Sequence, residues 1–202
     1  IPARAERVFV GKRGGRVSER QTEINGRLVR AAQEGRTVVR LKGGDPYLFG
    51  RGSEEAEALA NAGIPFEVVP GVPSPLAAPP YAGISLTHRD LASSVAFITA
   101  TESPEKDGSS HDWAHLATAT QTLVIFMGRR RLASMMRSLL EHGRSPETPV
   151  AVVQWASLPR QRTVVGTVAD IHLRVAEAGI GTPALTIVGE VVKLRETLRW
   201  FD

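Results

Sequence analysis

The sequence predicts an α/β protein of two lobes with a cleft between them, a mostly parallel sheet in the N-terminal lobe and a mixed sheet in the C-terminal lobe. Short β-branched runs alternate with helical patterns through residues 1–100, as in parallel sheets with right-handed crossovers. In residues 101–202 the apolar runs follow one another through short links, which favours partly antiparallel pairing. A polar stretch at 101–110 separates the two patterns. We therefore place the domains at 1–100 and 101–202.

In the first half, strands are expected at residues 7–10, 37–42, 66–69 and 94–100. A capping-box spacing at 18–21 opens a helix that Gly35 ends. A second helix starts at Ser53 and closes at 61–63, and a helix of small residues covers 76–81. Strands and helices alternate, which predicts that the loops after the strands gather at one edge of the sheet.

In the second half, a helix starts at residue 112, a strand spans 121–127 and a helix spans 129–142. Met135 and Met136 lie on the apolar face of that helix, and we interpret them as core residues rather than as a cofactor site. Strands follow at 149–154, 162–168 and 185–192, with a helix at 170–178.

Composition limits the classes of function. The chain is 42% hydrophobic and 23% charged, has no apolar run long enough to span a membrane and no secretory leader pattern, so we expect no membrane partner. Cysteine is absent, which excludes thiolate catalysis and Cys-based zinc sites and makes a cytoplasmic location the expectation. The net charge is +4 and aromatic residues are 5%, so a small polyanionic substrate fits better than a nucleic acid.

The most informative stretch is residues 38–55, which reads as a strand, a glycine loop and a helix capped by Ser53. Glycines at the end of a strand let a ligand lie directly on the backbone. Open α/β sheets bind small molecules at this place. A bare Gly-Gly-Asp-Pro sequence would by itself indicate no more than a tight turn.

The longer string RLKGGDPYLFGRGSEE, followed by GIPFEVVPGV and YAGISLTHR, closely resembles the uroporphyrinogen-III C-methyltransferases. These are tetrapyrrole methylases that use S-adenosylmethionine. The resemblance extends to the end of the chain and implies a tetrapyrrole methylase-like fold. It implies an enzyme that methylates uroporphyrinogen III to precorrin-2, for sirohaem or cobalamin synthesis, with S-adenosylhomocysteine as the second product.

In the family, loops at strand ends hold S-adenosylmethionine largely through backbone contacts and small apolar walls. Each corresponding position here is otherwise explained as a turn or core residue, and Met127 alone would be interpreted as core. Pro73-Ser74 stands where the family has Thr-Ser or Thr-Ala. The resemblance implies cofactor binding by Gly43, Gly44, Asp45, Leu48, Pro73, Ser74, Met127, Ala156 and Ala184.

Lys12 matches the family position proposed as a proton donor, although a Lys in a glycine-rich turn is ordinarily a solvated loop residue. Arg51, His88 and Arg89 are implied to bind the carboxylates of uroporphyrinogen, since arginine recognises carboxylates in bidentate fashion. Each is otherwise explained as a surface ion pair, or, for His88, as a structural histidine. The remaining histidines lack metal-ligand spacing with an acidic third ligand, so no metal site is expected.

The family opens with a strand, a glycine-rich loop, a helix and a second strand before the Val-Gly-Lys segment, whereas this sequence starts close to that segment. We therefore expect the first strand, loop and helix to be missing from the sequence, and a homodimer to cover the exposed strand edges. Three alternatives stay open: a methyltransferase acting on a later precorrin, a non-catalytic homologue that binds S-adenosylmethionine or a tetrapyrrole, and a basic RNA-binding module.

Overall fold

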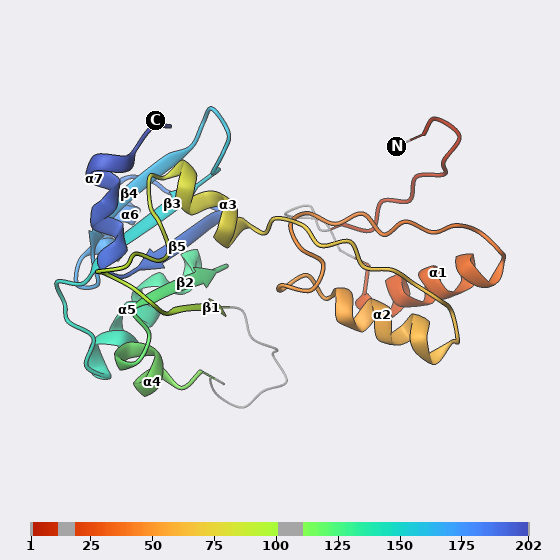
Figure 1. Ribbon diagram of the computed structural model, residues 1–202, viewed down its shortest axis with the longest axis horizontal. Helices are drawn as coiled ribbons and strands as arrows, with labels where there is room; N and C mark the ends of the chain where they lie inside the picture. Colours follow the sequence, from red (N-terminus) through yellow and green to blue (C-terminus); the bar gives the residue numbers. More distant parts are fainter. Residues whose placement is uncertain (1, 12–18, 101–110, 202) are drawn as a thin grey trace. The chain divides into compact units, whose positions relative to one another are not determined.

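The computed structural model describes residues 2–11, 19–100 and 111–201 (Figure 1). The chain divides into two compact units, residues 1–72 and 73–202. The expected first lobe ran to residue 100. Residues 73–100 belong to the second unit because Ala78, Ala82 and Ala92 are buried in the same cluster as Val124 and Ile187.

The first unit is built on two helices, α1 (Gln21–Gln33) and α2 (Gly52–Asn61), which pack along each other (Figure 1). The backbone N–H of Arg20 donates to the Glu23 carboxylate at 3.0 Å, which closes the first turn of α1. Ile24 and Ala56 are buried on the two helices. Both helices were predicted, and α2 ends at Asn61 as expected.

The N-terminal parallel sheet predicted for this unit is not formed by the described residues. Segments 7–10, 37–42 and 66–69 are extended, but they belong to no strand. A strand is stabilised by a hydrogen-bonded neighbour and by side-chain pairs across it. Among the described residues these segments make no ladder, and Val39 and Val69 are about four-fifths exposed, at 80% and 79%.

The second unit contains a mixed five-stranded sheet in the order β1-β2-β5-β3-β4. β1 (Val95–Thr99) and β2 (Thr122–Phe126) pair in parallel, so the strand expected in the N-terminal sheet belongs to the C-terminal sheet. The remaining neighbours, β5 (Ala184–Val188), β3 (Pro149–Gln154) and β4 (Arg162–Thr167), pair antiparallel. The α/β class and the mixed character of the C-terminal sheet are confirmed.

Helices cover both faces of this sheet, because successive strand side chains point to opposite sides. Leu123 and Ile125 pack in one cluster with α4 (Trp113–Thr118), α5 (Leu132–Glu141) and α6 (Ile171–Glu177). Val124 packs in a second cluster with α3 (Ser74–Tyr81) and the 3-10 turn η2 (Glu190–Leu194). A short helix, α7 (Arg195–Leu198), follows η2.

Two predicted elements have bounds that differ from the expectation. The strand expected to reach residue 192 stops at Val188, because Gly189 has a φ of 142° and an added Cβ would lie 2.5 Å from the Gln121 carbonyl oxygen. The helix expected from residue 129 begins as a 3-10 turn of three arginines, η1 (Arg129–Arg131), and becomes α-helical at Leu132.

Candidate functional site

The glycine loop at 43–51 is held in place by one carboxylate. Oδ1 of Asp45 accepts the N–H groups of Tyr47 at 2.8 Å and Leu48 at 3.1 Å, and Oδ2 accepts the N–H of Gly71 at 3.1 Å. The hydrogen bond from Gly71, followed by that from Tyr47, lowers the pKa of Asp45. The carboxylate of Asp45 therefore organises the loop, while the backbone of the neighbouring glycines stays accessible.

The glycines of this loop have different surroundings. An added Cβ at Gly71 would lie 2.2 Å from the Gly44 carbonyl oxygen, so the two backbones are in close contact. At Gly43, by contrast, an added Cβ meets nothing within 4 Å. Phe49 and Arg51 have positive φ values of 53° and 58°, a conformation that non-glycine residues adopt rarely and that clusters at binding sites.

A buried carboxylate on α2 links the segment that precedes this loop to helices α1 and α2. Glu55 on α2 is 4% exposed, and it accepts hydrogen bonds from Lys42 at 3.0 Å, Arg40 at 3.1 Å and Gln21 at 3.1 Å. Burial raises the pKa of Glu55, but the hydrogen bond from Lys42 and the other two donors outweigh it and lower that pKa. Lys42 directly precedes Gly43, so this network fixes where the loop begins.

Arg51, predicted to bind substrate, forms a two-pronged ion pair with Glu54, with Nε 2.7 Å from Oε1 and Nη2 2.6 Å from Oε2. The two side chains are 52% and 45% exposed. The hydrogen bond from Arg51 lowers the pKa of Glu54. Substrate binding by Arg51 stays a prediction. Lys12 lies outside the described residues.

In the second unit, one edge of the sheet gathers three of the predicted cofactor residues. Thr99 is in register with Phe126, Ile125 with Thr186, and Gln154 with Ala184. The carboxyl ends of β1, β2 and β3 and the amino end of β5 therefore share an edge. The predicted residues there are Met127, Ala156 and Ala184.

The backbone at this sheet edge is unusual. Met127, Trp155 and Ser157 have positive φ values of 53°, 52° and 67°. With Phe49 and Arg51 they make up the described non-glycine residues of positive φ, and every one lies in a predicted ligand loop or beside a predicted ligand residue. Met127 is 54% exposed, so it is not the core residue that its position after an apolar strand would suggest.

Pro73 and Ser74 lie at the start of α3, with Pro73 buried as its N-cap residue and Ser74 exposed as its first residue. α3 packs against β5, the strand that begins at Ala184. Their contact with a cofactor stays a prediction.

His88 and Arg89 are not brought to the edge that carries Met127. They lie in the turn before the amino end of β1, where the His88 N–H donates to the Ala92 carbonyl at 2.9 Å. The ring nitrogen Nδ1 of His88 accepts the Asp90 N–H at 3.2 Å. His88 thus has a structural role in this turn, and substrate binding by the pair stays a prediction.

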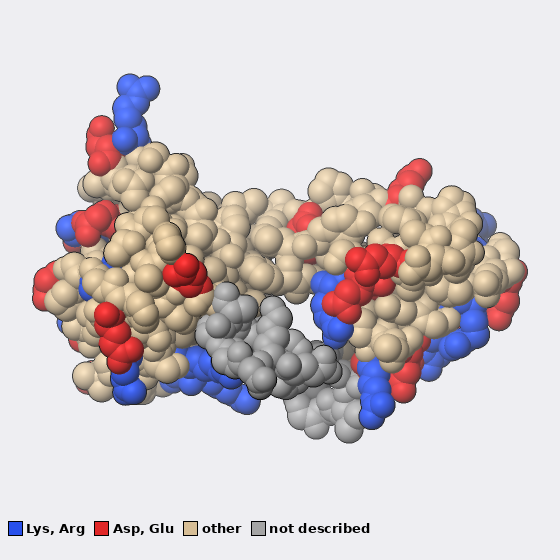
Figure 2. Space-filling view, turned by 90° about the horizontal axis from the view of Figure 1, so that it is seen from below, with Lys and Arg blue, Asp and Glu red and all other residues tan. Residues whose placement is uncertain are grey.

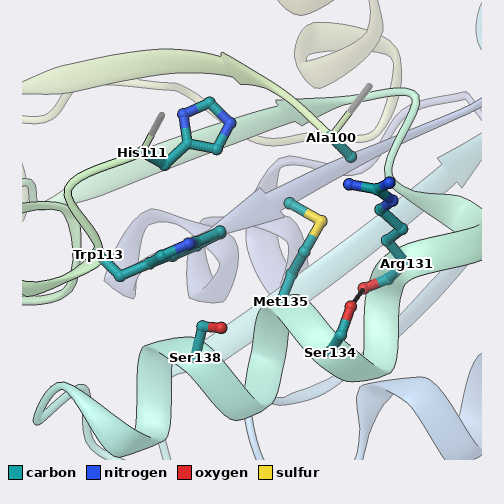
Figure 3. A pocket seen from close by; sticks show the side chains of 7 residues that line it. All are labelled: Ala100, His111, Trp113, Arg131, Ser134, Met135 and Ser138. Atoms are coloured by element: carbon teal, nitrogen blue, oxygen red, sulfur yellow. Dashed lines mark hydrogen bonds between the residues drawn. The ribbon is translucent and has the colours of Figure 1, made fainter. Parts of the chain in front are cut away.

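A cavity of about 150 Å³ opens beside the same sheet edge, at the end of β1 (Figure 3). No local sequence pattern indicated this cavity, because its lining residues come from three separate segments. Met135 was expected to be core and is 4% exposed, yet its thioether also reaches the cavity wall. The lining residues are Ala100, His111, Trp113, Arg131, Ser134, Met135 and Ser138.

Within residues 2–11, 19–100 and 111–201, no group of three or more His, Cys, Asp or Glu side chains is arranged to hold a metal ion. No helix in the same ranges is long and apolar enough to cross a membrane.

Comparisons with known proteins agree with this geometry. Residues 2–172 match the family described as tetrapyrrole (corrin/porphyrin) methylases. An S-adenosyl-L-methionine-dependent uroporphyrinogen III methyltransferase of Methanosarcina barkeri is 50% identical over 198 residues, which cover 98% of this chain and 78% of that protein. The siroheme synthase of Azotobacter vinelandii is 50% identical over 199 residues, or 98% of this chain and 42% of that protein. The chain therefore spans about two-fifths of such siroheme synthases.

Among solved structures, the uroporphyrin-III C-methyl transferase of Thermus thermophilus complexed with S-adenosyl homocysteine superimposes with a TM-score of 0.77. It is 40% identical in sequence, and the match covers 95% of this chain and 80% of that one.

Proposed function

Because the chain belongs to the tetrapyrrole (corrin/porphyrin) methylase family, we propose that it transfers methyl groups from S-adenosylmethionine to carbon atoms of uroporphyrinogen III. The product is precorrin-2, for sirohaem or cobalamin synthesis. The observation that carries the proposal is the 50% identity to a uroporphyrinogen III methyltransferase over 98% of this chain.

The residues present fit the methyl donor. Gly43 offers open backbone with nothing within 4 Å of an added Cβ, so a flat group can lie directly on it. At the sheet edge, Met127 supplies an exposed thioether side chain beside the small residues Ala156 and Ala184. We assign these four residues, with Gly44, Asp45, Leu48, Pro73 and Ser74, to the cofactor site.

When bound, the sulfonium group supplies a reactive methyl, so the chain itself must orient the substrate carbon and handle a proton. Lys12 is the proposed proton donor. Arg51, His88 and Arg89 are proposed to bind substrate carboxylates. The Arg51–Glu54 pair is exposed, so a substrate carboxylate can compete with Glu54 for the same guanidinium edge.

We also propose that the protein acts as a homodimer in the cytoplasm. A partner would cover the apolar side chains that the extended segments of residues 1–72 expose, among them Phe9 at 69% and Val39 at 80%. The absence of cysteine fits a reducing compartment.

A methyl-transfer assay tests the proposed activity. The protein, at the full length that its gene encodes, is mixed with S-adenosylmethionine and freshly reduced uroporphyrinogen III, and precorrin-2 is followed by its absorbance. Turnover that depends on both substrates is expected. Binding of S-adenosylhomocysteine without turnover would instead indicate a non-catalytic homologue, and turnover only with a later precorrin would reassign the substrate.

A further inference from the structure

The cavity at the end of β1, called the α5 pocket below, adjoins the sheet edge that carries Met127. It begins at Ala100, directly after β1, and the parallel neighbour β2 leads into Met127 and Gly128. An added Cβ at Gly128 would lie 3.6 Å from the sulfur of Met135, which lines the pocket. A molecule that reacts beside Met127 therefore has this pocket within reach of its substituents.

One wall of the pocket is apolar and held in place. The rings of His111 and Trp113 meet edge to face, with centroids 5.6 Å apart and an interplanar angle of 84°. Nε2 of His111 lies 2.8 Å from the Thr99 carbonyl oxygen, which fixes the imidazole against the end of β1. The Met135 side chain points into the pocket from α5 and adds a thioether to this wall (Figure 3). This wall suits methylene groups.

The other wall carries a cation. The guanidinium of Arg131 reaches toward Ala100 at the rim of the pocket (Figure 3), and the Ser134 hydroxyl donates to the Arg131 carbonyl at 2.9 Å, which steadies its backbone. In the part of the chain that the structure describes, no carboxylate forms an ion pair with Arg131. By contrast, Nε of the neighbouring Arg129 donates to the Ile180 carbonyl at 2.5 Å.

Size limits what the α5 pocket can hold. Pockets that enclose a whole ligand usually measure about 300–1,000 Å³, whereas this one measures about 150 Å³. It therefore fits one short substituent of a larger molecule. A cation beside an apolar wall is the complement of a carboxylate carried on one or two methylene groups.

Resting on the function proposed above, we propose that the α5 pocket binds one carboxylate arm, acetate or propionate, of the tetrapyrrole substrate. Arg131 at the rim of the pocket binds the carboxylate of the arm. Trp113 and Met135 contact the methylene groups of the arm. This places a substrate-recognition residue in a segment of three arginines whose sequence pattern did not indicate a site.

The test compares Arg131→Gln with Arg130→Gln. Both variants remove one exposed arginine from the same 3-10 turn, and Arg130 does not line the pocket. Binding of uroporphyrin III is measured by its fluorescence anisotropy without methyl donor, and the KM values for uroporphyrinogen III and S-adenosylmethionine are measured separately. Arg131→Gln is expected to weaken porphyrin binding and raise the tetrapyrrole KM by about tenfold or more, without changing the KM for S-adenosylmethionine. Arg131→Lys should restore part of the affinity because it keeps the charge.

The outcomes separate this inference from the proposed activity. Porphyrin binding that depends on Arg131, without methyl transfer, supports the pocket and overturns the activity. Methyl transfer in which Arg131→Gln and Arg130→Gln have equal tetrapyrrole KM values supports the activity and overturns the pocket. Absence of uroporphyrin III binding by the unaltered protein overturns the pocket as well.

Discussion

Replacing Glu55 by glutamine should loosen the first unit more than any surface charge change nearby. The Glu55 carboxylate, 5% exposed, lies against donors from Lys42, Arg40 and Gln21, and the first two side chains are 12% and 28% exposed. A glutamine keeps one acceptor oxygen but turns an NH2 group toward the ammonium and the guanidinium. Two cations would then lose their counter-charge in a largely buried place.

The loss of stability expected for Glu55→Gln can be worked out from the exposed fractions of these side chains. Removing one partner of a buried ion pair costs about 3–5 kcal/mol, and the lower value applies because Arg40 can turn partly to solvent. A loss of about 3 kcal/mol increases the equilibrium population of the opened form by about 150-fold. The matched control is Glu54→Gln, which breaks the exposed pair with Arg51 and should cost no more than about 1 kcal/mol.

Amide hydrogen exchange followed by mass spectrometry is the suitable assay, because Trp113, Trp155 and Trp200 all lie in residues 73–202 and their fluorescence does not report on α1 and α2. Peptides from these two helices should exchange faster in Glu55→Gln than in Glu54→Gln. Equal exchange in the two variants would refute the argument that the Glu55 network holds the unit together.

The pH dependence of the same variant has a definite sign. The pKa of Glu55 is lowered from its ordinary value of 4.5, so its contribution is present above that value and is lost as the pH falls through the folded-state pKa. Glu55→Gln should lack this part of the acid sensitivity of α1 and α2.

Three further predictions concern the loops. Gly71→Ala should disrupt the glycine loop, since its Cβ would lie 2.2 Å from the Gly44 carbonyl oxygen. Gly43→Ala should leave the loop intact, because the added Cβ enters open space. Hydrogen exchange of residues 43–51 measures both outcomes. Asp45→Asn should weaken the loop, and because the pKa of Asp45 is lowered, the stabilisation in the unaltered protein should disappear as the pH falls through that lowered value. Met127→Gly should stabilise the second unit by about 1 kcal/mol, because it removes the strain of a positive φ at a non-glycine residue. Urea unfolding followed by tryptophan fluorescence measures this change, and methyl transfer should fall in the same variant. A loss of stability would count against the strain argument.

The strands of the second unit were largely predictable, because their apolar residue pattern agrees with the strand pairing that the fold provides. Buried runs such as Leu123 to Ile125 have neighbours within the same unit, so local pattern and tertiary pairing agree. The runs at 37–42 and 66–69 have the same β-branched character, but strand formation also needs a hydrogen-bonded neighbour, and the described residues supply none. Gly189 ended β5 early through a backbone contact with Gln121, which is distant in sequence and therefore not visible in a local pattern.

The glycine loop of the candidate site could be predicted from its local sequence. The contacts between residues distant in the sequence could not. Asp45 was placed in the loop, but its three backbone partners include Gly71, far along the chain. The Glu55 network was missed, although charged residues at positions 40 and 42 of an apolar run were a usable signal. On the surface in Figure 2, acidic and basic side chains are interspersed over both units, so no broad basic patch points to RNA on this face.

The most direct test of the account is a calorimetric titration of the protein with S-adenosylhomocysteine, beside its Gly43→Ala variant. Saturable binding to the unaltered protein is expected, with a loss of affinity of about tenfold or more in the variant and unchanged hydrogen exchange of residues 43–51. Undetectable binding to the unaltered protein, or equal affinity in the two proteins, would contradict the claim that the methyl donor lies on the backbone of the glycine loop.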